Sequence, residues 1–99
     1  MMNIKKELNG DRLTIALEGR LDTMTSPELE KELQGCLADI SELTLDLGKL
    51  DYISSAGLRV LLTAHKALLG KDGMKVTNVN DIVLEVFEVT GFADILTIE

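Results

Sequence analysis

The stretch Asp51-Tyr-Ile-Ser-Ser-Ala-Gly-Leu-Arg59 joins a predicted strand to a predicted helix. Alternating apolar residues in Leu43-Thr-Leu-Asp-Leu47 precede it, and a strongly apolar run from Leu58 to Leu69 follows it. Alternation is typical of a strand, whereas apolar residues three and four positions apart are typical of a helix. The first backbone N–H groups of a helix lack intrahelical partners, and the helix dipole makes that end partly positive. Ser54 and Ser55 therefore stand where a hydroxyl can cap a helix and where a phosphate would be accepted.

Upstream, two short runs of alternating polarity, residues 4–8 and 13–17, lie on either side of Asn9-Gly10. Alternating runs around an Asn-Gly turn predict a β-hairpin. Residues 19–25 have no clear periodicity, so we expect a loop there.

Ser26-Pro27 carries the features of a helix start, with Ser26 as N-cap, Pro27 at the first position and Glu28 in the first turn. An apolar stripe at helical spacing follows, formed by Leu29, Leu33, Cys36, Leu37 and Ile40. We expect one helix to extend along this stripe, although Gly35 lowers its stability by about 1 kcal/mol relative to alanine.

The C-terminal third predicts a strand at 74–79 and a helix that Asn80-Asp81 can cap and Thr90-Gly91 can stop. A short element of undefined type ends the chain. The predicted order is strand, strand, helix, strand, helix, strand, helix, which is typical of the α/β class. We expect a mixed β-sheet of about four to five strands with helices packed against it.

Composition restricts the possible functions. The 99 residues include 10 Lys+Arg and 17 Asp+Glu, giving a net charge of −7. Nucleic acids and anionic membrane surfaces attract basic proteins, so neither is an expected partner. No apolar run reaches the ~18 residues of a membrane span, and one cysteine is compatible with a reducing compartment. We expect a single cytoplasmic domain over residues 1–99, without membrane insertion.

The sequence offers no obvious catalytic or metal-binding constellation. His65 is the only histidine, and its spacing to the neighbouring leucines favours a packing role. Cys36 falls on an apolar stripe, and no Cys/His cluster or glycine-rich phosphate loop is present. We expect a protein that is not an enzyme and needs no metal or cofactor. By default, Ser54 and Ser55 would be helix-capping residues and Asp22 a turn residue.

Several separated motifs, however, resemble the STAS domains of bacterial anti-sigma factor antagonists. They are Leu17-Glu-Gly-Arg-Leu-Asp22, Leu43-Thr-Leu-Asp-Leu47, Leu50-Asp-Tyr-Ile-Ser-Ser-Ala-Gly-Leu-Arg59 and Phe87-Glu-Val-Thr-Gly-Phe92. The resemblance covers residues 12–99, in the order and spacing of the family.

The resemblance implies a phosphorylation site. In the family, a serine that follows an aspartate is phosphorylated by an anti-sigma factor that is also a serine kinase. Ser55 matches the acceptor, Ala56 and Gly57 match the next two positions, and Asp22 matches an aspartate in the adjacent loop. Ser54 replaces the usual aspartate and is therefore an alternative acceptor. We also expect Ser55 to cap the helix.

The resemblance also implies a partner-switching role, in which the unphosphorylated domain binds the anti-sigma factor kinase and so releases a sigma factor. The expected contact surface comprises Asp22, Thr23, Ser54, Ser55, Ala56, Gly57 and Arg59. A phosphatase acting on the phosphoserine is a further expected partner. One alternative is a STAS subunit of another assembly, such as a signalling scaffold or a regulator of lipid or anion transport. An enzyme would instead require His65, Asp22 and the two serines to converge.

Overall fold

The computed structural model describes residues 2–99, whose N-terminal part is a β-hairpin. Strands β1 (Met2–Asn9) and β2 (Arg12–Leu21) pair in antiparallel fashion across a two-residue turn. Gly10 adopts a φ of 68° in this turn, a left-handed conformation that glycine adopts at little cost. The predicted hairpin is confirmed.

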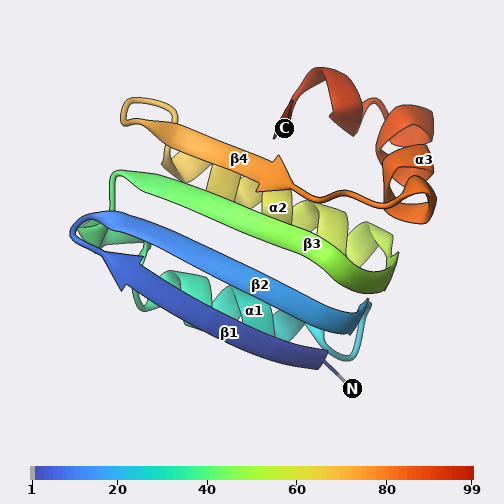
Figure 1. Ribbon diagram of the computed structural model, residues 1–99, viewed down its shortest axis with the longest axis horizontal. Helices are drawn as coiled ribbons and strands as arrows, with labels where there is room; N and C mark the ends of the chain where they lie inside the picture. Colours follow the sequence, from blue (N-terminus) through green and yellow to red (C-terminus); the bar gives the residue numbers. More distant parts are fainter. Residues whose placement is uncertain (1) are drawn as a thin grey trace.

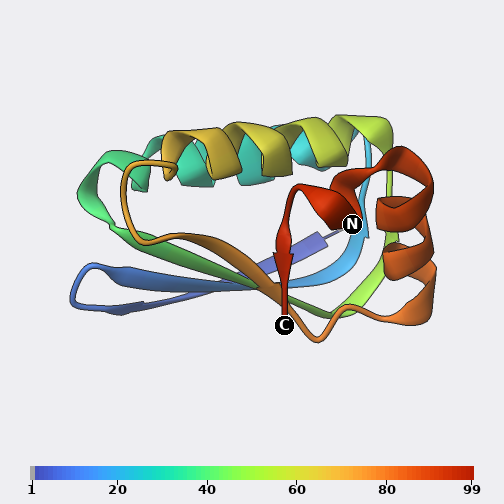
Figure 2. The same cartoon turned by 90° about the horizontal axis from the view of Figure 1, so that it is seen from above.

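The sheet continues with three strands parallel to β2, namely β3 (Glu42–Ile53), β4 (Gly73–Thr77) and β5 (Thr97–Ile98). Within residues 2–99 the strand order is β1-β2-β3-β4-β5. Parallel neighbours need long crossover connections. Those from β2 to β3 and from β3 to β4 contain helices α1 (Ser26–Gln34) and α2 (Ser55–Ala67). Both helices cover the same face of the sheet (Figure 1, Figure 2). The expected mixed α/β architecture is therefore correct.

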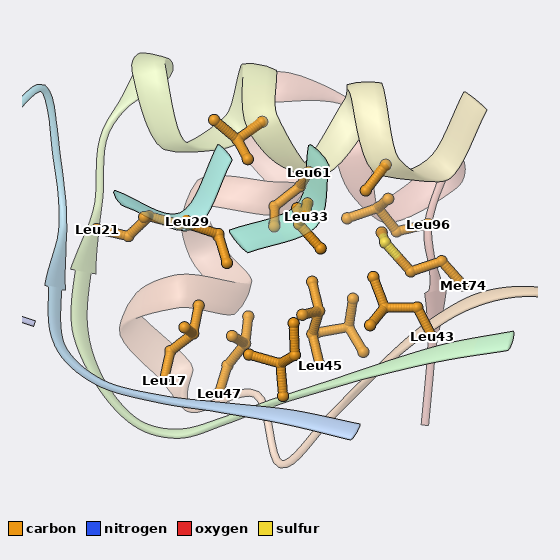
Figure 3. Close-up of a cluster of buried hydrophobic side chains, with 14 of the residues drawn as sticks. Leu17, Leu21, Leu29, Leu33, Leu43, Leu45, Leu47, Leu61, Met74 and Leu96 are labelled. Atoms are coloured by element: carbon orange, nitrogen blue, oxygen red, sulfur yellow. The ribbon is translucent and has the colours of Figure 1, made fainter. Parts of the chain in front are cut away.

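The core lies between this sheet face and the two helices and is almost entirely aliphatic. Alternate residues of β2 and β3, such as Leu17 and Leu45, point toward Leu29, Leu33 and Leu61 of the helices (Figure 3). Fully burying a side chain of this kind stabilises the fold by about 1.5–3 kcal/mol. The intervening residues of β2 and β3 are polar or small and form the opposite face of the sheet.

Helix α3 (Asp81–Thr90) packs at one end of the sheet, beside the end of β3 (Figure 1). Asn80 fixes it there in two ways. Its side-chain oxygen accepts a hydrogen bond from Val83 N at 3.0 Å, and its Nδ2 donates to Leu50 O at 2.6 Å. Gly91, with a φ of 84°, terminates the helix. Short 3₁₀ helices follow at Phe92–Asp94 and, earlier in the chain, at Leu37–Asp39.

Four sequence expectations about element boundaries are wrong. The strand expected at 74–79 is β4, which begins at Gly73 and ends at Thr77. Residues 19–21 belong to β2, because they pair with the distant end of β3. Helix α1 ends at Gln34, and Gly35 is its C-cap, so Cys36 and Ile40 lie outside the helix. Thr25 rather than Ser26 occupies the N-cap position of α1. The end of β2 was missed because local periodicity does not report strand pairing. Helix α1 is shorter than expected because the chain must leave it early to return to the sheet.

Candidate partner-binding site

The start of α2 is anchored by Ser54, not by Ser55. Ser54 has an extended backbone (φ −98°, ψ 175°), and its hydroxyl oxygen accepts a hydrogen bond from Gly57 N at 3.4 Å. Its own N–H donates to Leu21 O at 2.9 Å. Ser55 is the first residue of the helix and is exposed. The expectation that Ser55 caps α2 is therefore wrong, and its hydroxyl faces solvent.

Gly57 brings the helix start into direct contact with the sheet. A Cβ atom at this position would lie 2.8 Å from Leu21 Cγ, 2.9 Å from Ile53 Cγ1 and 3.0 Å from Leu21 O. These contacts are too close for any side chain. The register of β2 and β3 shifts between Ala16 and Glu18 and again after Gly19, and both strands bend toward the helices (Figure 2). Such irregularities re-aim a strand end, and here they carry Leu21 and Ile53 to the start of α2.

Asp22 follows Leu21 directly and organises a tight turn. Its Oδ1 accepts hydrogen bonds from Met24 N at 3.0 Å and Thr25 N at 3.1 Å. The Thr25 hydroxyl donates to Arg20 O at 2.7 Å and accepts from Asp22 N at 2.9 Å. The structure thus gives Asp22 a clear structural role. Thr25 is equally involved and was not expected from local periodicity; the Asp-x-x-Thr spacing is the signal in the sequence that points to it.

The environment of Asp22 keeps its carboxyl group ionised. Desolvation raises the pKa of Asp22. The opposite effect is larger, so the pKa lies below its usual value, because Asp22 accepts hydrogen bonds from Thr25 and Met24 and lies near the charge of Arg20. Arg20 Nε lies 3.6 Å from Asp22 Oδ2, and the Arg20 guanidinium stacks 4.5 Å from the centre of the Tyr52 ring. Arg20 and Tyr52 are thus neighbours of the site that were not among the expected contact residues.

A groove of about 220 Å³ separates the first turns of α1 from the first turns of α2. It brings together three residues of the expected contact surface, Thr23, Ala56 and Arg59. The remaining lining residues were not anticipated and are Ser26, Pro27, Glu30, Val60 and Thr63. Beside the groove residue Thr23, the Met24 side chain is 84% exposed. Methionine is a flexible apolar residue that adapts to the surface of a binding partner.

The convergence that an enzyme would need is not present. His65 lies ten residues after Ser55 on the same helix, roughly 15 Å away along its axis. It lines a different hollow, with Leu68, Lys71 and Met74. Within residues 2–99, no group of three or more His, Cys, Asp and Glu side chains is placed to hold a metal ion.

Comparison with known proteins decides the family. The model of the family described as "Mlab, STAS domain" matches residues 4–97. The chain belongs to the STAS domain family. This chain is 40% identical over 89 residues to BtrV of Bordetella bronchiseptica, and the match covers 87% of this chain and 76% of BtrV. BtrV is named as a candidate anti-sigma factor antagonist. This chain is also 31% identical to the anti-sigma-B factor antagonist of Listeria monocytogenes, covering 99% of this chain and 90% of that protein.

Solved structures share the fold of this STAS domain. An anti-sigma factor antagonist from Mycobacterium paratuberculosis superimposes with a TM-score of 0.90 at 21% identity, covering 99% of this chain and 85% of that chain. The Bacillus protein SpoIIAA in its phosphorylated form superimposes with a TM-score of 0.77 at 16% identity, covering 98% and 91%. The resemblance inferred from the sequence motifs is therefore confirmed. In the part of this STAS domain that the structure describes, no helix is long and apolar enough to cross a membrane.

Proposed function

We propose that this STAS domain is an anti-sigma factor antagonist that binds an anti-sigma factor with serine kinase activity and so releases a sigma factor. It acts as a regulatory binding protein and not as an enzyme. The observation that carries the proposal is the exposed Ser55 hydroxyl at the start of α2, beside the groove lined by Thr23, Ala56 and Arg59. The names of BtrV and of the Listeria relative support the same function.

The contact surface that we propose combines the Asp22 turn with the first turns of α2. Gly57 supports this assignment, because its contact with Leu21 ties the helix start to the strand that leads into the turn. Arg59 and Thr23 supply polar groups from the two sides of the groove. Exposed Met24 adds an apolar contact. Apolar contacts with a polar rim are the usual composition of a protein interface.

Ser55 is the proposed phosphorylation site, and its geometry distinguishes it from Ser54. The Ser54 hydroxyl is half-buried and already accepts a hydrogen bond from Gly57 N, so a kinase would have to disrupt the helix cap to reach it. The Ser55 hydroxyl has no such role in the cap. Serine and aspartate are both good N-caps, so Ser54 replaces the family's aspartate without loss of the cap but without its charge.

Phosphorylation would act as an electrostatic switch. A phosphate adds about −1.5 to −2 charges. Within the domain, the positive end of α2 offsets this by roughly 0.3–1 kcal/mol. At a buried contact with a partner, an unpaired charge costs roughly 2–5 kcal/mol. The second effect is larger, and each ~1.4 kcal/mol weakens binding tenfold. A phosphatase would restore binding, and ATP and Mg²⁺ would belong to the kinase.

The test is a titration calorimetry series with a purified kinase-type anti-sigma factor from the same organism. Ser55→Asp should weaken binding at least about tenfold, whereas Ser55→Ala should bind like the parent. Asn3→Asp adds the same charge at an exposed position of β1 and is the matched control. After incubation with kinase and ATP, mass spectrometry should place the phosphate on Ser55. Equal binding by parent and Ser55→Asp would contradict the proposal and favour a STAS subunit of another assembly.

A further inference from the structure

Helix α3 is apolar on both its inner and its outer side. Val83 and Phe87 are fully buried against the rest of the domain. On the outer side, Ile82 is 60% exposed, Val89 is 80% exposed and Val86 between them is half-buried. A surface helix ordinarily buries its apolar face and exposes a polar one, so exposed apolar residues on the outer side of a helix depart from this pattern. The outer apolar row therefore needs an explanation.

Ile82, Val86 and Val89 form one continuous row, which we call the outer α3 row. Their spacing of four and three residues places them on the same face of a helix. The helix lies at the end of the sheet in both views of the ribbon (Figure 1, Figure 2), and Figure 1 shows it on the opposite side of β3 from α1. This row does not include Ser55, Asp22 or any residue of the groove between α1 and α2.

A second row, purely acidic, runs beside the outer α3 row. Asp81, Glu85 and Glu88 have the same four-and-three spacing and are each offset by one residue from the apolar row. Residues 76–99 also contain Asp94 and Glu99 and no lysine or arginine. Lys75 Nζ lies 3.8 Å from Glu99 Oε1 and balances that carboxylate. Among residues 2–99, however, no ion pair forms with Asp81, Glu85 or Glu88, so the acidic row of α3 is not balanced within the domain.

These two rows define the chemistry of a complementary partner. We propose that the outer α3 row docks a basic amphipathic helix of a partner protein, with the partner's apolar row on Ile82, Val86 and Val89 and its basic row against Asp81, Glu85 and Glu88. Helices that pair in this way use an apolar seam flanked by opposite charges. A second copy of this chain would bring acidic rows together, and an anionic membrane would be repelled. The proposal does not depend on phosphorylation of Ser55.

The test is an NMR titration of the full chain labelled with ¹⁵N. The probe is a synthetic 18-residue helical peptide that has leucines at three- and four-residue spacing and a flanking row of lysines. The control peptide replaces each lysine with glutamate. We expect amide shifts concentrated in residues 81–91 with the basic peptide only. The double variant Ile82→Ser/Val89→Ser should weaken binding at least about tenfold. Leu8→Ser/Leu69→Ser, which removes two exposed apolar side chains elsewhere, should bind like the parent.

A charge-reversed variant keeps the test decisive if the serine variant unfolds. Glu85→Lys/Glu88→Lys leaves the apolar side chains in place and should reverse the preference, so that the glutamate peptide binds and the lysine peptide does not. The proposal is overturned if the shifts scatter over other acidic surfaces or if the charge reversal changes nothing. It is also overturned if sedimentation shows a dimer that Ile82→Ser/Val89→Ser abolishes, because a second copy would then cover the row.

Discussion

Gly57 of α2 contacts Leu21 of β2 so closely that a Cβ atom on the glycine would lie 2.8 Å from Leu21 Cγ. This contact joins the two parts of the candidate site, because Leu21 precedes the Asp22 turn and Gly57 lies in the first turn that Ser54 caps. The position of the Ser55 hydroxyl relative to the Asp22 turn therefore depends on the absence of a side chain at residue 57.

Gly57→Ala should destabilise the domain by about 1–3 kcal/mol, because the added methyl overpacks against Leu21 and Ile53. Urea unfolding followed by circular dichroism measures the change. Gly35→Ala is the matched control, since its Cβ would lie 3.6 Å from the nearest heavy atom, an ordinary contact, at a φ of −76°. It should be neutral or stabilising by about 0.4–1 kcal/mol. Equal destabilisation by both variants would contradict the prediction.

Ser54→Ala should cost about 0.5–2 kcal/mol of stability, because it removes the side-chain cap of α2. Ser55→Ala should be within about 0.5 kcal/mol of the parent, because Ser55 is an exposed residue outside the cap. Ser54→Asp should keep parental stability, since aspartate is also a good N-cap. Thermal melts of the three variants test this order, and a greater loss in Ser55→Ala than in Ser54→Ala would contradict it.

Asp22 should make stability depend on pH in the acidic range. Because folding lowers the pKa of Asp22, its ionised carboxylate stabilises the fold above its unfolded pKa of about 3.9. That contribution is lost as the pH falls through the lower folded value. Asp22→Asn should therefore be less stable than the parent at neutral pH, with the difference shrinking toward pH 3. Urea unfolding across this range measures it, and Thr25→Ser, which keeps the hydroxyl, should follow the parent's profile.

Arg59 should act as an internal counter-ion for a phosphate on Ser55, because the two residues are four positions apart on one face of α2. A nearby cation favours the dianion, so Arg59→Gln should raise the second pKa of the phosphoserine. A ³¹P NMR titration of the phosphorylated proteins measures this pKa. Lys66→Gln, which removes an exposed cation further along α2, is the control and should leave it unchanged. Identical shifts in both variants would exclude a specific role for Arg59.

Local sequence patterns were sufficient for several elements. The turn at Asn9-Gly10-Asp11, the leucine alternation of β3 and the Asn80 cap each depend on residues close together in the chain, and all three are present in the structure. The four separated motifs between Leu17 and Phe92 were together also sufficient to identify the STAS family. Boundaries were less predictable, as the extension of β2 to Leu21 shows, because a strand end is determined by a partner strand distant in sequence.

The sequence by itself determined the fold class, because period-two and helical patterns of leucine, isoleucine and valine specify which side of each element is buried. It also placed two hydroxyls at the start of α2. Only the tertiary structure decided between them. Ser54 N donates a hydrogen bond to Leu21 O, and the extended backbone there directs the Ser54 hydroxyl to Gly57 N. Ser55 takes no part in the cap and is exposed to solvent. The same holds for the outer α3 row, since Phe87 and Ile82 are both apolar in the sequence and only packing against the sheet buries one and exposes the other.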